Sequence, residues 1–498
     1  MKIGFRVDFG GTVGFGHFSR SASLAKAFQR AGHEVIFFSR GPQEAYQNAF
    51  FKGLRSEDLE VIPMDSSLSD LSAGAPLGPD FSRLDALETK KLFSEHKAET
   101  LIVDSYSLSN LWVHHWGRHA DLMSISDASA PDGVDTVLDY GFDAVSSKHA
   151  VEPGDNRRGL FGPGFALVSS NFSKFKDLPI IDRFSSGLGL VSLGGAATSS
   201  LWSLVIKSVL KAFEKSQLLV PDSQTLQQVM TQNSDRRVIL RGQVRGLDDF
   251  FEHADFAVVN AGVTMYELLA SGKPGIALVT AENQRPAFHA KRRAETVNGG
   301  ELSAVDEVVF GLRQEILSSS NSPALTWLKS RSVVDHSGPD RVVFALGMGT
   351  KQRHLLREAG PLDLPFLLRL VNQQSTREAS FNQSVVLPAD HLKWFKSSPD
   401  KERRIWIYEA SGVSVGHCRL DNREGVWELD YSILEIFQGM GHATDMMKLL
   451  LIEARHFNHL VAFVKPGNMG SIAVLKRVGF IVSSTTPVSI KLEWRVRI

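Results

Sequence analysis

Strand-forming runs alternate with helical segments along the first 280 residues, and this alternation limits the possible folds more than any other feature. Strands that alternate with helices form βαβ units, in which the strands pair in parallel between two layers of helices. The predicted strands are 2–8, 34–38, 99–103, 122–125, 187–193, 237–240, 256–259 and 275–279. The sequence therefore predicts an α/β protein with two doubly wound Rossmann-like lobes, residues 1–172 and 173–348, and a cleft between them.

The pattern changes near residue 351, where a third domain is expected. A short helix is predicted at 366–371, followed by consecutive strands at 404–408, 413–419 and 426–433 and a further helix at 444–454. Consecutive strands are typical of hairpins rather than of βαβ units, so residues 353–498 are expected to form an α+β domain. A chain of 498 residues is also too long for one hydrophobic core.

The composition excludes several kinds of partner. The 55 lysine and arginine residues balance 55 aspartate and glutamate residues, so no net charge attracts nucleic acids or acidic membranes. The single cysteine, Cys418, excludes an internal disulfide and is typical of a reducing compartment. No apolar run approaches the roughly 20 residues of a membrane-spanning helix, and the first residues lack a signal-peptide pattern. We therefore expect a cytoplasmic protein with small-molecule substrates, and the sequence leaves its oligomeric state open.

A glycine-rich segment, GGTVGFGHFSR at 10–20, joins the first predicted strand to the first predicted helix. Glycines at such a turn allow a diphosphate to approach the backbone, where the N–H groups of the helix start favour anions. The dinucleotide fingerprint requires a glycine where Ser19 stands and an acid after the second strand, where Arg40 stands. The sequence therefore excludes a nicotinamide cofactor and favours another diphosphate, bound near Gly14 and Gly16.

His17 is the candidate catalytic base because it lies where this helix begins. The positive end of the helix dipole disfavours protonation of an imidazole, which leaves it neutral and able to accept a proton. Asp8, at the end of the first strand, is the expected partner of its other ring nitrogen. A histidine in this place can also serve only as a structural cap of the helix.

The second predicted lobe contains a candidate nucleotide site in the run 260–274. Glu267 lies about one turn into a helix that follows a strand, where a carboxylate can accept both hydroxyls of a ribose. Gly262 and the helix start would approach the diphosphate. Asn283 and Gln284 begin the next helix and are expected to reach the sugar. The alternative for Glu267 is a solvated helix residue.

Residues 1 to about 348 resemble the UDP-sugar hydrolases of pseudaminic acid biosynthesis, relatives of the two-lobed GT-B glycosyltransferases. The matching positions are 6–8, 14–17, Arg20, 104–106, Gly194, Gly195, 260–274, Asn283 and Gln284. The resemblance implies hydrolysis of UDP-2,4-diacetamido-2,4,6-trideoxy-altrose to the free sugar and UDP. It also implies that His17 activates the attacking water, that Asp104 and Tyr106 line the substrate site, and that no metal is needed.

The chain departs from this family at two places. Ser105 stands where many members have a histidine, in a run of Asp-His-Tyr, and 126–127 replace a pair of acids with Ser-Asp. These departures leave the identity of the sugar open. A separate cluster, His114, His115 and His119, lacks a nearby acid or cysteine and is interpreted as a solvated helix rather than a metal site.

The last third resembles the GNAT family of N-acetyltransferases. The run QGMGHA at 438–443 matches the loop that binds the pyrophosphate of acetyl-CoA, and the helix that begins near 468 matches the helix beside that co-substrate. The resemblance implies an acetyl-CoA-dependent N-acetyltransferase in residues 353–498. The implied contacts are Gln438, Gly439, Gly441, His442, Ala443, Asn468 and Ser471.

The general base of this domain is left open between Glu428 and Asp430, which alternation places on one face of a strand. A tyrosine acid is absent from the residues that follow Phe480, and Tyr431 is interpreted as a packing residue. Cys418 is expected to be a small core residue.

Together the two resemblances predict a bifunctional enzyme that acetylates a UDP-linked 4-amino sugar and then hydrolyses the product. Two alternatives remain from the sequence. The first two lobes can instead transfer the sugar to an acceptor, as a glycosyltransferase does. They can also be a non-catalytic sugar-nucleotide scaffold joined to an active acetyltransferase.

Overall fold

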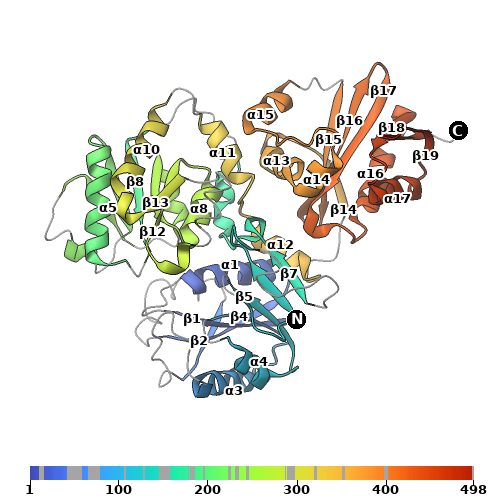
Figure 1. Ribbon diagram of the computed structural model, residues 1–498. Helices are drawn as coiled ribbons and strands as arrows, with labels where there is room; N and C mark the ends of the chain where they lie inside the picture. Colours follow the sequence, from blue (N-terminus) through green and yellow to red (C-terminus); the bar gives the residue numbers. More distant parts are fainter. Residues whose placement is uncertain are drawn as a thin grey trace. The chain divides into compact units, whose positions relative to one another are not determined.

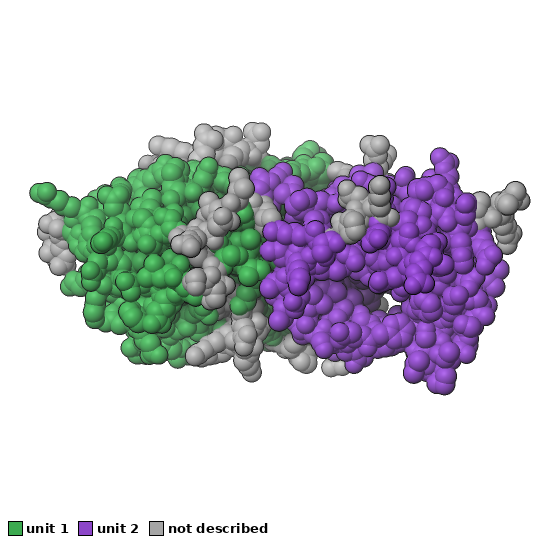
Figure 2. Space-filling model, turned by 90° about the horizontal axis from the view of Figure 1, so that it is seen from above, with its two compact units in different colours: residues 1–175, 179–343 green, residues 176–178, 344–498 purple. Residues whose placement is uncertain are grey.

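In the computed structural model the chain forms two compact units, residues 1–175 with 179–343 and residues 176–178 with 344–498 (Figure 2). The structure describes residues 1–9, 16–41, 59–65, 79–105, 108–126, 129–144, 157–177, 179, 185–194, 197–221, 226–229, 235–242, 246–285, 288, 298–318, 322–349, 354–397 and 402–495. Among them, no helix is both long and apolar enough to span a membrane.

The first lobe is built on a seven-stranded parallel sheet in the order β3-β2-β1-β4-β5-β6-β7 (Figure 1). The order of its first five strands is that of a Rossmann fold, in which ligands bind at the carboxyl ends of the strands. The strands are β1 (Lys2–Asp8), β2 (Glu34–Arg40), β3 (Glu60–Pro63), β4 (Thr100–Asp104), β5 (Asp121–Ile125), β6 (Thr136–Asp139) and β7 (Arg158–Phe161). The helices are α1 (Gly16–Arg30), α3 (Pro79–Glu95) and α4 (Asn110–Trp116).

Opposite faces of this sheet are covered by different helices. Phe5 of β1 packs on Phe28 of α1, with ring centroids 6.2 Å apart, so α1 covers one face. Ile36, Leu101 and Val103 belong to a core with residues of α3 and α4, which cover the other face. Because neighbouring residues of a strand point to opposite faces, the two residues at each strand end face different helices.

The second lobe has a six-stranded parallel sheet in the order β10-β9-β8-β11-β12-β13, again that of a Rossmann fold. Its strands are β8 (Leu188–Ser192), β9 (Gln217–Pro221), β10 (Val238–Arg241), β11 (Phe256–Asn260), β12 (Gly275–Val279) and β13 (Asn298–Glu301). Its helices are α5 (Ser199–Ala212), α7 (Asp248–His253), α8 (Val263–Ser271), α10 (Val305–Leu317) and α11 (Pro323–Arg331), followed by α12 (Gly338–Ala345). The predicted pair of Rossmann-like lobes is therefore confirmed.

Helix α12 contacts the first lobe although it follows the second lobe in sequence. The guanidinium of Arg341 donates from Nε to the carbonyl of Gly164 at 2.7 Å. Gly338 lies so close to the backbone of Ala166 that an added Cβ would be 2.0 Å from its carbonyl oxygen. Arg30 of α1 also donates to Asp340 at 2.7 Å. The chain thus returns to the first lobe before it enters the second unit.

The second unit contains a mixed sheet in the order β14-β15-β16-β17-β18-β20-β19. Its strands are β14 (His354–Glu358), β15 (Arg403–Ala410), β16 (Val413–Arg423), β17 (Val426–Ile433), β18 (His459–Val464), β19 (Ile481–Thr485) and β20 (Ile490–Arg495). Its helices are α13 (Leu364–Asn372), α14 (Gln374–Ala379), α15 (Pro388–Lys396), α16 (His442–Glu453) and α17 (Met469–Arg477). The 3₁₀ turns in the described part of the chain are Pro163–Phe165, Ser170–Phe175, Glu282–Gln284, Leu302–Ala304, Pro361–Asp363, Glu435–Phe437 and Ala454–Phe457. The predicted α+β architecture is confirmed.

Strands β17 and β18 pair in parallel over only two positions, Trp427 with Leu460 and Glu428 with Val461. Both strands continue beyond this point, β17 to Ile433 and β18 to Val464. They therefore separate after Glu428. Beyond this point the backbone N–H and C=O groups on the facing edges of β17 and β18 no longer pair with each other, although each strand stays paired on its other side. Such groups are available to a ligand that enters between the strands.

Candidate functional site

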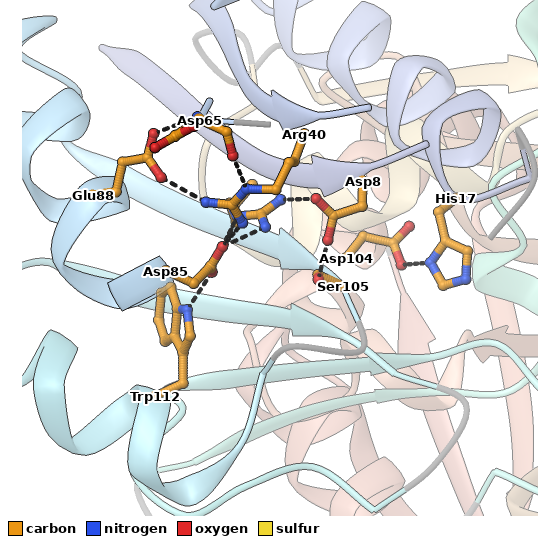
Figure 3. Close-up of polar contacts among 10 residues, drawn as sticks. Asp8, His17, Arg40, Asp65, Asp85, Glu88, Asp104, Ser105 and Trp112 are labelled. Atoms are coloured by element: carbon orange, nitrogen blue, oxygen red, sulfur yellow. Dashed lines mark hydrogen bonds and ion pairs between the residues drawn. The ribbon is translucent and has the colours of Figure 1, made fainter. Parts of the chain in front are cut away.

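His17 and Asp104 form the centre of the candidate site in the first lobe (Figure 3). His17 is the second residue of α1, and Asp104 is the last residue of β4. Nδ1 of His17 lies 2.6 Å from Oδ1 of Asp104. The His17 side chain keeps 11% of its surface exposed, whereas the Asp104 side chain is buried. The pair thus joins a buried carboxylate to an imidazole that solvent can reach.

Two further residues of α1 hold Asp104 in place. Arg20 donates from Nε to Oδ2 at 2.7 Å and from Nη2 to Oδ1 at 2.6 Å, and Ser21 donates to Oδ2 at 3.0 Å. Burial alone would raise the pKa of Asp104, but the charge of Arg20 and the bond to His17 hold it well below its usual range. An ionised carboxylate only accepts hydrogen bonds, so Nδ1 of His17 carries a proton and Nε2 is the basic nitrogen.

The prediction that Asp8 orients His17 is wrong. Oδ1 of Asp8 accepts from Arg6 at 2.5 Å, and Oδ2 accepts from Ser105 at 2.6 Å. The reason is the register of the sheet, in which Val7 rather than Asp8 lies opposite Asp104. Asp104 contacts α1 on one face, whereas Asp8 and Arg6 point to the other face, toward α3.

Aromatic residues connect this dyad to the second lobe. Arg20 donates from Nη1 to the hydroxyl of Tyr140 at 3.3 Å. The ring of Tyr140 meets the ring of Tyr266 in α8 edge to face, with centroids 5.0 Å apart. Phe142 stacks on the ring of Tyr266, with centroids 5.8 Å apart. A Cβ on Gly16 would lie 3.7 Å from Val263, the first residue of α8. The starts of α1 and α8 therefore lie next to each other, although the sequence analysis identified neither tyrosine.

Two predicted glycines of the second lobe flank the side chain of Asn260, the last residue of β11. A Cβ on Gly194 would lie 3.1 Å from its Nδ2, and a Cβ on Gly262 would lie 3.2 Å from the same atom. Gln284 accepts from the backbone N–H of Thr280 at 2.9 Å through Oε1. Its Nε2 lies 3.5 Å from the Cβ position of Gly262. The side-chain NH₂ groups of Asn260 and Gln284 thus both lie beside the start of α8.

Asn260 was not among the predicted contacts, although it belongs to the run that contains Gly262. Its Oδ1 atom is buried and accepts no hydrogen bond from the described residues. Gly194 has a φ of +82°, in the left-handed region that favours glycine. The structure therefore brings together Gly194, Gly262 and Gln284 and adds Asn260 to them.

Glu267 lies on α8, one residue after Tyr266, and is partly buried. No hydrogen bond or ion pair joins its carboxyl group to any other described residue. Burial, and to a lesser extent the charge of Asp248, raises the pKa of Glu267 to about 8. The group is thus protonated at neutral pH and has its hydrogen-bonding capacity available for a ligand.

Four predicted contacts receive no structural description. Gly14, Tyr106 and Gly195 lie outside the described residues, as does the side chain of Asn283. These assignments remain predictions from the sequence. At the expected start of the next helix the chain forms a 3₁₀ turn at Glu282–Gln284, and Arg285 after it is helical.

The second unit contains the predicted glycine loop before α16. Gly439 and Gly441 have φ values of +77° and +89°, and Gly441 is the N-cap of the helix. Gln438 donates from Nε2 to Ser375 and to the carbonyl of Ile433, both at 3.2 Å, which anchors the loop. The N–H groups of the first turn, which includes Ala443, are therefore presented at a loop shaped by two glycines.

The side chain of His442 does not face this loop. It is 6% exposed and lies against Tyr408, with Nδ1 3.4 Å from the tyrosine hydroxyl. Burial lowers the pKa of His442. An anion at the start of α16 would therefore meet the backbone N–H of His442 rather than a charged imidazole.

Asn468 and Ser471 organise the start of α17. Oδ1 of Asn468 caps the helix by accepting from the N–H of Ser471 at 3.1 Å. The hydroxyls of Ser471 and Tyr431 lie 2.8 Å apart. This contact joins β17 to α17 on the side where β17 and β18 separate. Burial raises the pKa of Tyr431 to about 12.

The two candidate bases differ in position and environment. Glu428 lies where β17 and β18 still pair, and Asp430 lies beyond the point of separation. Oδ2 of Asp430 is 3.2 Å from Nη2 of Arg419. Desolvation would raise the pKa of Asp430, but the charges of Arg419 and Arg377 and a backbone hydrogen bond together outweigh it, so the pKa is lowered. Asp430 is therefore ionised at neutral pH and is the carboxylate nearer to the opening between the strands.

A buried imidazole lies beside Asp430, which the sequence analysis did not identify. Nδ1 of His417 is 3.0 Å from the hydroxyl of Ser432. Burial lowers the pKa of His417 to about 4, so the ring is neutral. The thiol of Cys418 is buried as expected, and burial raises its pKa.

Among the residues that the structure describes, no three His, Cys, Asp or Glu side chains are placed to share a metal ion. His114 and His115 lie in the last turn of α4. The ring of His119 meets Trp116 at 5.2 Å.

Residues 353–481 match the family model of the acetyltransferase (GNAT) domain. The second unit contains a GNAT acetyltransferase domain. Acetyl-CoA is the acetyl donor of this family, so the predicted co-substrate is confirmed. Over 142 residues, 26% of this chain, the sequence is 25% identical to the L-methionine sulfoximine/L-methionine sulfone acetyltransferase of Pseudomonas aeruginosa, of which it covers 83%.

Two further comparisons cover longer stretches of the chain. The chain is 22% identical over 305 residues to the uncharacterized protein MJ1062 of Methanocaldococcus jannaschii. This alignment covers 58% of the chain and 57% of that relative, so the chain spans little more than half its length. The crystal structure of Acinetobacter baumannii MurG aligns with a TM-score of 0.46 and 12% identity, over 70% of this chain and 99% of that one.

Proposed function

We propose that this chain is a bifunctional nucleotide-sugar enzyme. Its GNAT domain N-acetylates a UDP-4-amino-4,6-dideoxy sugar with acetyl-CoA. Its first unit hydrolyses the resulting UDP-2,4-diacetamido-2,4,6-trideoxy-altrose to the free sugar and UDP, as in pseudaminic acid biosynthesis. The observation that carries the hydrolase assignment is the His17–Asp104 dyad, which lies at the start of α1 beside the start of α8.

In the hydrolytic step His17 is the general base. Nε2 takes a proton from water while the water oxygen bonds to the anomeric carbon, and the bond from that carbon to the β-phosphate oxygen breaks. Asp104 stabilises the imidazolium that forms, because its ionised carboxylate accepts from Nδ1 at 2.6 Å. UDP leaves as the anion, and the proton on His17 passes to solvent.

The second lobe supplies the contacts for UDP. The N–H groups at the start of α8 and the amides of Asn260 and Gln284 are suited to the diphosphate. Glu267 lies further along α8, and its carboxyl has no protein partner among the described residues. In the proposed complex it is ionised and accepts both hydroxyls of the ribose.

In the acetyl-transfer step the sugar amine attacks the thioester carbonyl of acetyl-CoA. The new C–N bond forms as the C–S bond breaks, and CoA leaves as the thiolate, which takes up a proton from solvent. The pyrophosphate of CoA lies at the loop with Gly439 and Gly441, and the pantetheine arm enters where β17 and β18 separate. Asp430 accepts the proton of the amine. It has this role because it lies beyond the point where β17 and β18 separate, whereas Glu428 lies where they still pair.

The proposal is tested with the full-length chain and the UDP-4-amino precursor, with and without acetyl-CoA, by phosphorus NMR of UDP release. We expect release that depends on acetyl-CoA and disappears in His17→Ala. In that variant the N-acetylated nucleotide sugar should accumulate instead. Acetylation without UDP release in the wild-type protein would contradict the hydrolase and favour a glycosyltransferase that lacks its acceptor.

Turnover that is unaffected by His17→Ala would indicate a scaffold with one active domain. A protein that releases UDP from the acetylated sugar but not from the amine, with or without acetyl-CoA, would contradict only the acetyl-transfer step. The two halves of the proposal are therefore tested separately by supplying each nucleotide sugar in turn.

A further inference from the structure

A network of buried charges lies under the first sheet, on the face opposite to α1 (Figure 3). Arg6 of β1 is fully buried and donates from Nη2 to Oδ1 of Asp85 at 2.6 Å. Through Nη1 the same guanidinium donates to Asp8 at 2.5 Å. Trp112 of α4 donates to the second oxygen of Asp85 at 2.7 Å. Asp85 of α3 is thus the hub of the network.

Arg40 of β2 extends the network in the other direction. Its Nη1 donates to Asp85, and its Nη2 donates to Glu88 of α3 at 2.6 Å. Its Nε donates to the backbone carbonyl of Asp65 at 2.9 Å. The charges of the two arginines hold the pKa of Asp85 at about 2 despite its burial. One set of ion pairs and hydrogen bonds therefore joins two strands, β1 and β2, to helices α3 and α4.

This network costs the protein the desolvation of several charges. A buried ion pair can often be replaced by apolar side chains without loss of stability, whereas removal of one partner is strongly destabilising. Net stabilisation therefore does not by itself explain why the protein has this network. The position of the network gives another reason, because one of its ends lies beside the dyad.

That end is the hydrogen bond between Asp8 and Ser105. Oδ2 of Asp8 accepts from the hydroxyl of Ser105 at 2.6 Å. Ser105 directly follows Asp104, and Asp8 ends the strand that precedes the glycine segment and α1. One carboxylate thus joins the ends of the two strands that lead to His17 and to Asp104.

We propose that Asp8 is a positioning residue, which acts through the hydroxyl of Ser105 to place the Asp104 carboxylate on Nδ1 of His17. Arg6 and Asp85 hold the Asp8 carboxylate in turn. The consequence for catalysis rests on the proposed hydrolase, but the placement itself does not.

The placement is tested without substrate by NMR of the full-length chain with ¹⁵N-labelled histidine, with His17 assigned from His17→Gln. The wild-type protein should show a downfield, slowly exchanging proton on Nδ1 of His17. We expect Ser105→Ala and Asp8→Asn to broaden or remove it, and Ser105→Thr to retain it because the hydroxyl is kept. Asp8→Asn breaks a buried ion pair and can prevent folding. Ser105→Ala removes one hydroxyl and leaves the ion pairs intact, so it tests the proposal even when Asp8→Asn does not fold.

The matched control is Glu99→Gln. Glu99 accepts from the backbone N–H of Lys2 at 2.9 Å and so joins β1 to the start of β4, at the opposite edge of the sheet. The His17 signal should be unchanged in this variant. An unchanged signal in Ser105→Ala, or an equal loss in Glu99→Gln, would overturn the positioning role.

Kinetics with the UDP-diacetamido sugar separate this inference from the proposed function. Misplacement of a catalytic group by about 1 Å costs on the order of 100-fold in rate. We expect Ser105→Ala to lower kcat by about 10- to 100-fold with KM unchanged. If the wild-type protein does not hydrolyse the sugar, the proposed function fails, and the NMR result still decides whether Asp8 positions Asp104.

Discussion

Oδ1 of Asp104 lies 2.6 Å from Nδ1 of His17, and Nη2 of Arg20 lies 2.6 Å from the same oxygen. One carboxylate thus binds a permanent cation and an imidazole at once. Because Arg20 neutralises its charge, Asp104 can remain ionised in a buried place. The chemistry proposed for the first unit depends on this arrangement.

Replacement of Asp104 by asparagine should abolish most of the hydrolysis. The amide no longer specifies the tautomer of His17, and it removes the charged acceptor of the hydrogen bonds from the buried Arg20. In serine proteases the corresponding change lowers kcat by about 10⁴-fold, and we expect a loss of 10³- to 10⁴-fold here on the same grounds. Steady-state kinetics of UDP release measure it.

Asp135→Asn is the control for this variant, because Asp135 accepts a hydrogen bond from Leu122 in the same sheet but away from the dyad. It should retain activity. Equal losses in Asp104→Asn and Asp135→Asn would attribute the effect to the stability of the sheet and not to the dyad.

UDP binding should release a proton because of Glu267. In the free protein the pKa of Glu267 is about 8, so the carboxyl is protonated at pH 7. Acceptance of two ribose hydroxyls requires the ionised form, so binding lowers this pKa and expels the proton. UDP affinity should therefore rise as the pH approaches 8 and then level off.

Isothermal titration calorimetry at pH 7 in two buffers with different ionisation enthalpies measures this proton. We expect close to one proton from Glu267 per UDP in the wild-type protein and its loss in Glu267→Gln, together with weaker binding. A proton count that is the same in both proteins would show that Glu267 does not contact the ribose as an anion.

Gly441→Ala should weaken CoA binding. Gly441 has a φ of +89° and caps α16, a conformation that costs other residues about 1–2 kcal/mol. A cost of this size corresponds to roughly a tenfold weaker complex, if the loop shifts to relieve it. Calorimetry with CoA measures the change in Kd.

Gly311→Ala is the control, because Gly311 lies inside α10, away from the loop, and has no atom within 4 Å of an added Cβ. Alanine is a better helix former than glycine, so this variant should bind CoA as the wild-type protein does. Equal affinity of Gly441→Ala would remove the loop from the proposed CoA site.

Asp430→Asn should slow acetyl transfer more than Glu428→Gln. Asp430 lies beyond the point where β17 and β18 separate, whereas Glu428 lies where they still pair. General base catalysis contributes about 10²- to 10⁴-fold, so we expect a loss in this range for Asp430→Asn. Thiol release from acetyl-CoA with the UDP-4-amino sugar measures it, and the opposite ranking would assign the base to Glu428.

The alternation of strands and helices was sufficient to predict the two lobes, because parallel strands covered on both faces must be apolar. The strands β3, β6 and β7 of the first lobe and β9 and β13 of the second lobe were missed. Each has four or five residues, and β7, which begins with Arg158 and Gly159, has no apolar run to mark it. The predicted ends of β1 and β4 lie close to the observed ends, so the prediction places His17 and Asp104 at the same carboxyl edge of the sheet.

The partner of His17 was predicted incorrectly because the sequence does not show which face a residue at a strand end points to. Asp8 and Asp104 both end strands, and only the pairing of Val7 with Asp104 shows that they face different helices. The contact between Tyr140 and Tyr266 joins two lobes and left no local signal.

The pairing of His417 with Ser432 did leave a signal. Glu424 and Gly425 have positive φ values and form a tight turn between β16 and β17. Counting outward from Arg423 and Val426 places His417 opposite Ser432. A hairpin turn fixes the register of its strands, so this neighbour of Asp430 was predictable.

Hydrolysis of the UDP-diacetamido sugar in H₂¹⁸O tests the central claim most directly. Attack of a His17-activated water on the anomeric carbon predicts one ¹⁸O atom in the free sugar and none in UDP, and no label incorporation in His17→Gln. Label in the β-phosphate of UDP would place the attack on phosphorus. Absence of both products from the wild-type protein would contradict the hydrolase itself.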